Sequence, residues 1–169
     1  MEQRYDLSGS LLHWYDYNKR ILPWRENKDP YRIWISEIML QQTRVEAVKP
    51  YFDRFMEVLP TVYDLAKVDD DRLMKLWEGL GYYNRARNLK AAAQTIVEEY
   101  GGQLPADYDK LLSLKGIGMY TAGAIGSIAF ELQVPAVDGN VLRVLTRLWG
   151  DDSDILKDKT KKAMGRRVM

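Results

Sequence analysis

Residues 111–130, LLSLKGIGMYTAGAIGSIAF, hold two glycines, Gly116 and Gly118, between two apolar stretches with helical spacing. Glycine allows a turn with positive φ and a close approach of another backbone, so this pattern predicts two helices joined by a tight hairpin. The second helix starts directly after the hairpin, and its free N–H groups are suited to binding a phosphate without reading sequence. The alternative is an ordinary helix–loop–helix corner. The binding hairpin is favoured by small residues that let the second helix pack tightly: Ala122, Gly123, Ala124 and Gly126.

Apolar residues recur at helical spacing along most of the chain. We expect helices over residues 10–22, 31–43, 45–59, 61–68, 71–81, 84–100, 107–114, 119–130 and 140–150. Thr61 and Asp107 predict N-caps, Gly101 predicts a helix end, and Pro50 predicts a kink or break. Strand alternation and long repeats are not found in the sequence. The predicted fold class is therefore all-α, with many short helices rather than a four-helix bundle.

The charge balance of the chain does not by itself indicate a nucleic-acid binder, because the net charge is only +1. Any DNA contact must come from local placement of charge and of backbone N–H groups. The basic stretch 157–167 is interpreted as a solvated terminus. The chain has no cysteine, which excludes disulfides and thiolate metal sites, and it has no apolar run of 18 residues. We expect a cytoplasmic protein without a membrane segment.

Several motifs, in order along the chain, carry a family resemblance. The hairpin followed by VDGNVLRV at 137–144 resembles the helix-hairpin-helix/Gly-Pro-Asp superfamily of DNA glycosylases. LPWR at 22–25, SEIMLQQT at 36–43 and GLGYYNRARNL at 79–89 resemble its adenine-specific MutY branch. The resemblance runs from about residue 6 to 157.

The resemblance implies a helix-hairpin-helix DNA glycosylase fold with two parts. A six-helix barrel domain is expected over residues 23–133, with the hairpin at about 107–129. A second helical lobe is expected from residues 1–22 and 134–169.

Breaking an N-glycosidic bond needs an acid for the leaving base and a negative charge beside the sugar cation. Glu37 lies among apolar residues, where partial desolvation would raise its pKa, although from sequence alone an exposed glutamate on an amphipathic helix is the stronger interpretation. The match to the family's catalytic motif implies instead that Glu37 protonates adenine at N7 and then helps to activate water.

Asp138 precedes Gly-Asn-Val-Leu and is a plausible helix N-cap, a role compatible with facing the sugar through its other oxygen. The family match implies that Asp138 stabilises the sugar cation or acts as a transient nucleophile. Asn140 is either a helper of Asp138 or a solvated first-turn residue. Tyr120 stands where relatives that also cut the backbone carry a lysine, so a monofunctional glycosylase is expected.

Other residues match family positions that touch DNA, although each one alone is more often a core or surface residue. Gln42 and Tyr82 match residues that wedge into the base stack, and Thr43 and Leu80 match positions near the opposite base. Trp24, Arg25 and Leu40 match the adenine pocket. Arg20 and Arg85 are either phosphate contacts or, as the sequence favours, solvated surface residues. His13 is interpreted as a surface or helix-packing residue.

The family pattern continues beyond this chain with four cysteines that hold a [4Fe–4S] cluster. Since the chain has none, we expect no cofactor in it, an incomplete second lobe, and apolar faces exposed near 6–22 and 138–149. We therefore expect a truncated chain with weak or absent activity.

The expected partner is double-stranded DNA with an A·8-oxoguanine or A·G mismatch, bound by a monomer. A mismatch thymine DNA glycosylase and a non-catalytic DNA-binding fragment are the alternatives.

Overall fold

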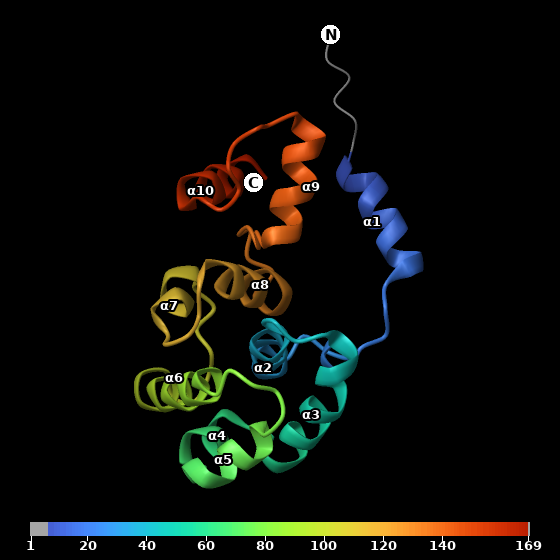
Figure 1. The fold of residues 1–169 in the computed structure, drawn as a ribbon. Helices are drawn as coiled ribbons and strands as arrows, with labels where there is room; N and C mark the ends of the chain where they lie inside the picture. The colour runs from blue at the N-terminus through green and yellow to red at the C-terminus, as the bar shows by residue number, and fades with distance from the viewer. Residues whose placement is uncertain (1–6, 169) are drawn as a thin grey trace.

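A computed structural model describes residues 7–168, and this part of the chain is all helical, as predicted. In Figure 1, α1, α9 and α10 lie at one end of the molecule, α4 and α5 lie at the other, and α2 lies between them. In chain order the elements are α1 (Leu7–Asn18), the 3-10 turn η1 (Pro23–Arg25), α2 (Pro30–Leu40), α3 (Val45–Val58), α4 (Val62–Lys67), α5 (Asp70–Trp77), α6 (Asn84–Tyr100), α7 (Tyr108–Ser113), α8 (Met119–Phe130), α9 (Gly139–Trp149) and α10 (Asp158–Arg167). Among these residues no helix is both long enough and apolar enough to cross a membrane.

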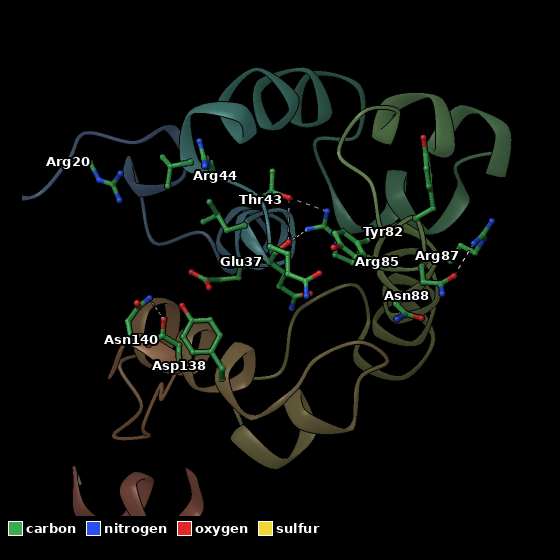
Figure 2. A pocket seen from close by; sticks show the side chains of 17 residues that line it. Arg20, Glu37, Thr43, Arg44, Tyr82, Arg85, Arg87, Asn88, Asp138 and Asn140 are labelled. Carbon is green, nitrogen blue, oxygen red and sulfur yellow. Dashed lines mark hydrogen bonds between the residues drawn. The ribbon is translucent and has the colours of Figure 1, made fainter. Parts of the chain in front are cut away.

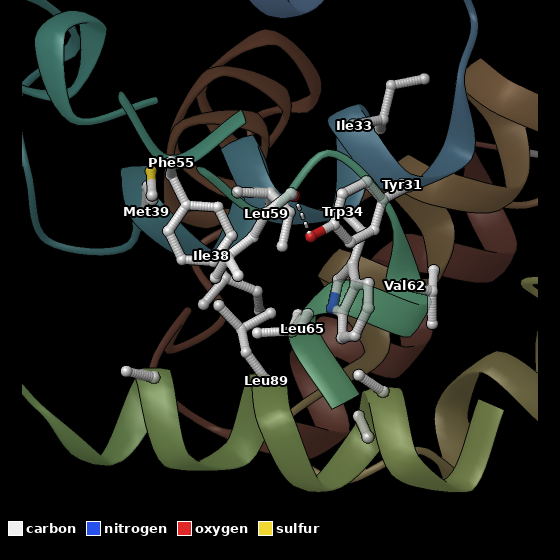
Figure 3. Packing of buried hydrophobic residues seen from close by; sticks show 14 of the residues in the cluster. Tyr31, Ile33, Trp34, Ile38, Met39, Phe55, Leu59, Val62, Leu65 and Leu89 are labelled. Carbon is white, nitrogen blue, oxygen red and sulfur yellow. Dashed lines mark hydrogen bonds between the residues drawn. The ribbon is translucent and has the colours of Figure 1, made fainter. Parts of the chain in front are cut away.

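The hydrophobic core is built around α2, which packs against α3, α6, α8 and η1. Trp34, Ile35 and Met39 of α2 are fully buried, and the core cluster extends from Leu22 to Ile125. Trp34 points toward Leu65 of α4 in Figure 3. This core fixes the position of α2, the helix that carries Glu37. The division into a domain over 23–133 and a second lobe stays a prediction.

Most of the predicted helix ends follow from local chemistry. The Thr61 hydroxyl accepts from the Asp64 amide at 3.2 Å, Asp107 accepts from the Lys110 amide at 2.9 Å, and Gly101 takes a left-handed φ of 61°. Of the predicted kink or break at Pro50, the break is wrong, because α3 runs through it, and the kink stays a prediction. Pro50 is exposed, and the buried Val48, Phe52 and Phe55 hold the helix in place on both sides of it.

The two ends of the described chain differ from each other. The basic stretch 157–167 is not frayed, since most of it forms α10 and buries Thr160 and Met164, but most of its Lys and Arg side chains are exposed, as the interpretation of a solvated terminus expects. By contrast, α1 exposes apolar side chains, with Trp14 58% exposed, and α9 exposes Val144 and Leu148. The expectation of exposed apolar faces on these two segments is confirmed.

Gly123 brings the segment after α8 back against this helix. A Cβ atom built on Gly123 would lie 2.2 Å from the carbonyl oxygen of Pro135, so the two backbones approach closely only because this side chain is absent. The segment thereby returns along α8 and delivers Asp138 to the end of the helix where Tyr120 lies.

Replacing Gly123 by alanine is therefore expected to lower the free energy of unfolding by about 1–3 kcal/mol, because the new methyl group displaces backbone rather than a flexible side chain. Urea unfolding followed by circular dichroism measures the change. Gly139→Ala is the control, since a Cβ atom at position 139 would have no other atom within 4 Å. Equal stability of the two variants would contradict the close approach.

Candidate active site

A cavity of about 1050 Å³ opens between α2, α8, the start of α9 and the loops before α3 and α6. Figure 2 shows Glu37 and Asp138, which are 101 residues apart in sequence, facing the same space. The cavity includes eight of the predicted site residues: Glu37, Leu40, Gln42, Thr43, Tyr82, Tyr120, Asp138 and Asn140. The fold thus brings both predicted carboxylates to one place.

Glu37 is a half-buried carboxyl group on α2, between the buried Ser36 and Ile38. Burial raises its pKa above the ordinary value of 4.5, and this effect outweighs the lowering by a hydrogen bond with Tyr120 and by the positive charge of Arg25. The negative charge of Asp138 also raises the pKa of Glu37. Glu37 therefore holds its proton to higher pH than an exposed glutamate does.

Tyr120 lies in the first turn of α8. Burial, and then the charge of Glu37, raise the pKa of its phenol far above the ordinary value of 10.0. The hydroxyl group therefore remains protonated, and it acts as a hydrogen-bond donor beside Glu37.

Asp138 is the N-cap of α9, and its Oδ1 accepts from the Val141 amide at 2.7 Å. Its Oδ2 accepts from the Asn140 side-chain amide at 2.9 Å. Asn140 in turn accepts from Arg143 at 3.3 Å. These contacts fix the orientation of a carboxylate that lines the cavity, so capping and facing the cavity coexist in Asp138.

Two exposed side chains project from strained loops at the cavity. Gln42 has a φ of 59° and Tyr82 a φ of 49°, in the left-handed region that non-glycine residues rarely adopt. Tyr82 is 63% exposed. Helix α2 ends at Leu40, ahead of the predicted end at residue 43, because the backbone leaves the helical region at Gln41, with a ψ of 113°.

The cavity lining does not include Trp24, Arg25, Leu80, Gly116 or Gly118. Trp24 is buried in the core, where it makes an edge contact with Phe52, and the centres of the two rings are 5.3 Å apart. Leu80 is buried as well. Arg25 is exposed, and its positive charge lowers the pKa of Glu37.

The hairpin glycines differ in what they do. Gly116 has a φ of 82°, and a Cβ atom there would lie 2.8 Å from Cβ of Asn88. Gly118 is extended, a Cβ atom there would have no other atom within 4 Å, and it caps α8 without a side-chain bond. The first N–H groups of α8 therefore have no side-chain cap from the residue that precedes the helix.

Three exposed arginines, Arg20, Arg44 and Arg87, line the cavity, which gives it positive charge despite the small net charge of the chain. Arg85 also lines it but is only 9% exposed, so the interpretation of Arg85 as a solvated surface residue is wrong. Its guanidinium group donates to backbone carbonyls inside the protein. The same nitrogens are therefore not free to bind a DNA phosphate. No pattern in the sequence distinguishes this buried arginine from its neighbours on α6.

An iron–sulfur cluster does not fit the residues present. The chain has no cysteine to supply thiolate ligands, and no group of three or more His, Asp or Glu side chains within 7–168 is placed to hold a metal ion.

Comparisons with known proteins agree with this geometry. Residues 35–168 match the HhH-GPD superfamily of base excision DNA repair proteins, which extends the match beyond the predicted limit of 157. An adenine DNA glycosylase from Rattus norvegicus is 47% identical over 148 residues, which cover 82% of this chain and 29% of the rat protein. The chain thus spans less than a third of that relative's length.

Two solved structures have a similar fold. A thermostable thymine-DNA glycosylase superposes with a TM-score of 0.85 at 31% identity, covering 94% of this chain and 73% of that protein. A trapped endonuclease III–DNA covalent intermediate superposes with a TM-score of 0.75 at 28% identity, covering 90% of this chain and 72% of that protein.

Proposed function

Because the chain belongs to the HhH-GPD superfamily of base excision DNA repair proteins, we propose that it is a monofunctional DNA glycosylase that removes adenine mispaired with guanine or 8-oxoguanine. The observation that carries the proposal is the meeting of Glu37, Tyr120 and Asp138 in one cavity. Curated relatives that carry the name adenine DNA glycosylase support the choice of base.

In the proposed reaction the C1′–N9 bond of the target nucleotide breaks, and its electron pair leaves with the adenine. Glu37, whose pKa is raised by burial, gives its proton to the leaving base, and Tyr120 orients the carboxyl group. Asp138, held by Val141 and Asn140, offsets the positive charge that develops on the sugar. Water then adds to C1′, and its proton returns to Glu37.

The proposal includes no strand-cutting step. A Schiff base needs an amine that attacks C1′ of the sugar, and Tyr120 offers a phenol whose proton is held tightly.

Double-stranded DNA is the proposed partner, bound without reading much sequence. The uncapped N–H groups of α8 after Gly118 suit one phosphate, and the exposed arginines around the cavity suit others. Gln42 and Tyr82 are the proposed wedge that extrudes the target base, and Thr43 and Leu80 are the residues proposed to lie near the opposite base. In this proposal Leu40 lines the adenine pocket, Arg25 provides charge, and Trp24 supports the pocket from the core.

Base release under single-turnover conditions, with the 169-residue chain in excess, tests the proposal because slow release is then measured as well. Adenine release from A·8-oxoguanine and A·G duplexes is expected, with no product trapped by borohydride. Preferential thymine release from a T·G duplex would favour the thymine glycosylase alternative. This alternative is tested because the chain also has a fold similar to that of a thymine-DNA glycosylase. Duplex binding without release, unchanged in Glu37→Gln, would favour a non-catalytic fragment.

The rate of release is expected to fall as pH rises through the raised pKa of Glu37, because the acid must carry its proton. The midpoint of this fall should lie above 4.5. Tyr120→Phe removes a hydrogen bond that lowers this pKa, and Arg25→Gln removes a charge that lowers it, so both variants should move the midpoint to higher pH. A midpoint unchanged in both variants would contradict Glu37 as the acid.

A further inference from the structure

Arg85 makes an unusual number of hydrogen bonds for one side chain. Its two terminal nitrogens donate to five backbone carbonyl groups and one hydroxyl group, with lengths of 2.8 Å to Ile38 and 3.0 Å to Met39 and to Leu80. The acceptors come from the end of α2, the loop after it and the loop before α6: Ile38, Met39, Gln41, Thr43, Leu80 and Gly81.

The surroundings of Arg85 are those of a buried structural cation. Its guanidinium group lies 5.4 Å from the centre of the Trp77 ring and 5.6 Å from that of Tyr82. Within residues 7–168 it forms no ion pair with a carboxylate. Burial lowers its pKa, although an arginine keeps its charge at any working pH. A buried charge without a counterion is costly, so these carbonyl groups must orient it well.

The bonds of Arg85 end directly beside the two strained residues of the cavity. The Gln41 carbonyl precedes Gln42, and the Gly81 carbonyl precedes Tyr82, so one guanidinium group joins both left-handed turns. Figure 2 shows Arg85 between Thr43 and Tyr82. The Gln41 side chain also donates to the Thr121 hydroxyl at 3.4 Å, which connects the same loop to α8 next to Tyr120.

We propose that Arg85 is a positioning residue that fixes Gln42 and Tyr82 as one rigid two-loop wedge for extruding the target base. The extrusion role rests on the proposed function, whereas the joining of the two loops is a property of the free protein. Left-handed non-glycine residues persist only where the surroundings hold them, and Arg85 provides that constraint on both loops. A lysine has the same charge, but its ammonium group cannot reach carbonyls on two sides as a planar guanidinium does.

Hydrogen exchange of the free chain tests the joining of the loops in Arg85→Lys. Amide exchange in segments 41–43 and 80–83 is expected to rise by about tenfold or more, while exchange in α4 stays unchanged. Arg54→Lys is the matched control, since Arg54 donates to a single carbonyl, that of Leu76, and lies outside the cavity lining. Unchanged exchange in both segments, or equally faster exchange throughout the chain, would overturn the proposal.

Fluorescence of 2-aminopurine tests the wedge role, because this adenine analogue brightens when it leaves the base stack. Opposite guanine, extrusion by Arg85→Lys is expected to be about tenfold slower or worse than by the unchanged chain and by Arg54→Lys. When 2-aminopurine stands opposite an abasic site, no base pair has to be broken. The extrusion rate of Arg85→Lys should then return to that of the unchanged chain. Equal slowing on both duplexes would show a structural role alone and overturn the proposal. If the unchanged chain extrudes neither base, the proposed function fails even where the exchange result holds.

Discussion

Replacing Glu37 by glutamine is expected to slow adenine release by about 10²- to 10⁴-fold, the range typical for the loss of a general acid. Glutamine keeps the shape of the side chain but has no proton to give. The effect is measured as the single-turnover rate on an A·8-oxoguanine duplex at the optimal pH of the unchanged chain. Glu57→Gln is the matched control, because Glu57 is an exposed glutamate on α3 outside the cavity lining.

The same variant should keep its stability, which separates chemistry from folding. A carboxyl group whose pKa is raised on folding stabilises the protein fully only below its unfolded pKa, and that contribution is lost as pH rises through the folded pKa. Since burial raises the pKa of Glu37, the charged carboxylate opposes folding near neutral pH. Glu37→Gln is therefore expected to melt at the same temperature as the unchanged chain or slightly higher. A clear loss of stability together with activity would argue against a dedicated acid.

Replacing Asp138 by asparagine is expected to slow release by about 10²- to 10³-fold, because the sugar cation loses the negative charge beside it. Asparagine caps helices as well as aspartate does, so the stability should change little. Asp138→Ala also removes the bond from the Val141 amide, and it should cost about a further 1 kcal/mol of stability. Urea unfolding and base release measured on both variants separate the two roles.

Asp69→Asn is the matched control for Asp138, since Asp69 caps α5 with the same kind of bond and does not line the cavity. A second readout comes from pH. The charge of Asp138 raises the pKa of Glu37, so Asp138→Asn should move the alkaline fall in rate to lower pH. Full activity of Asp138→Asn would show that Asp138 is only a cap.

The sequence predicts nine of the ten α-helices in residues 7–168 and misses α10, and many of the helix ends depend on neighbours within a few residues. Thr61 and Asp107 cap the helices they precede, and Gly101 ends α6. The break predicted at Pro50 is wrong for the same reason, since a local rule takes no account of the buried residues on both sides of Pro50 that hold α3 in place.

The site is predictable only through the family resemblance. Nothing in the sequence around Glu37 shows that Asp138 faces it, because the fold alone brings α2 and α9 together. Arg85 shows the limit of both approaches, since its partners are backbone carbonyls, which carry no residue-specific signal in a sequence. A buried role for such an arginine becomes visible only once the two loops are placed in space.

The neutral partners of Arg85 give the proposed DNA complex two different responses to ionic strength. Phosphate contacts by the exposed Arg20, Arg44 and Arg87 release counterions, so duplex affinity should fall as salt is added. The guanidinium group of Arg85 is held by buried carbonyl dipoles rather than by a counter-charge, and dissolved ions do not compete for it. Added salt should therefore lower the affinity for DNA while the conformation of the two-loop wedge stays the same. Binding of the duplex and extrusion of the base can then be separated by varying the salt concentration alone.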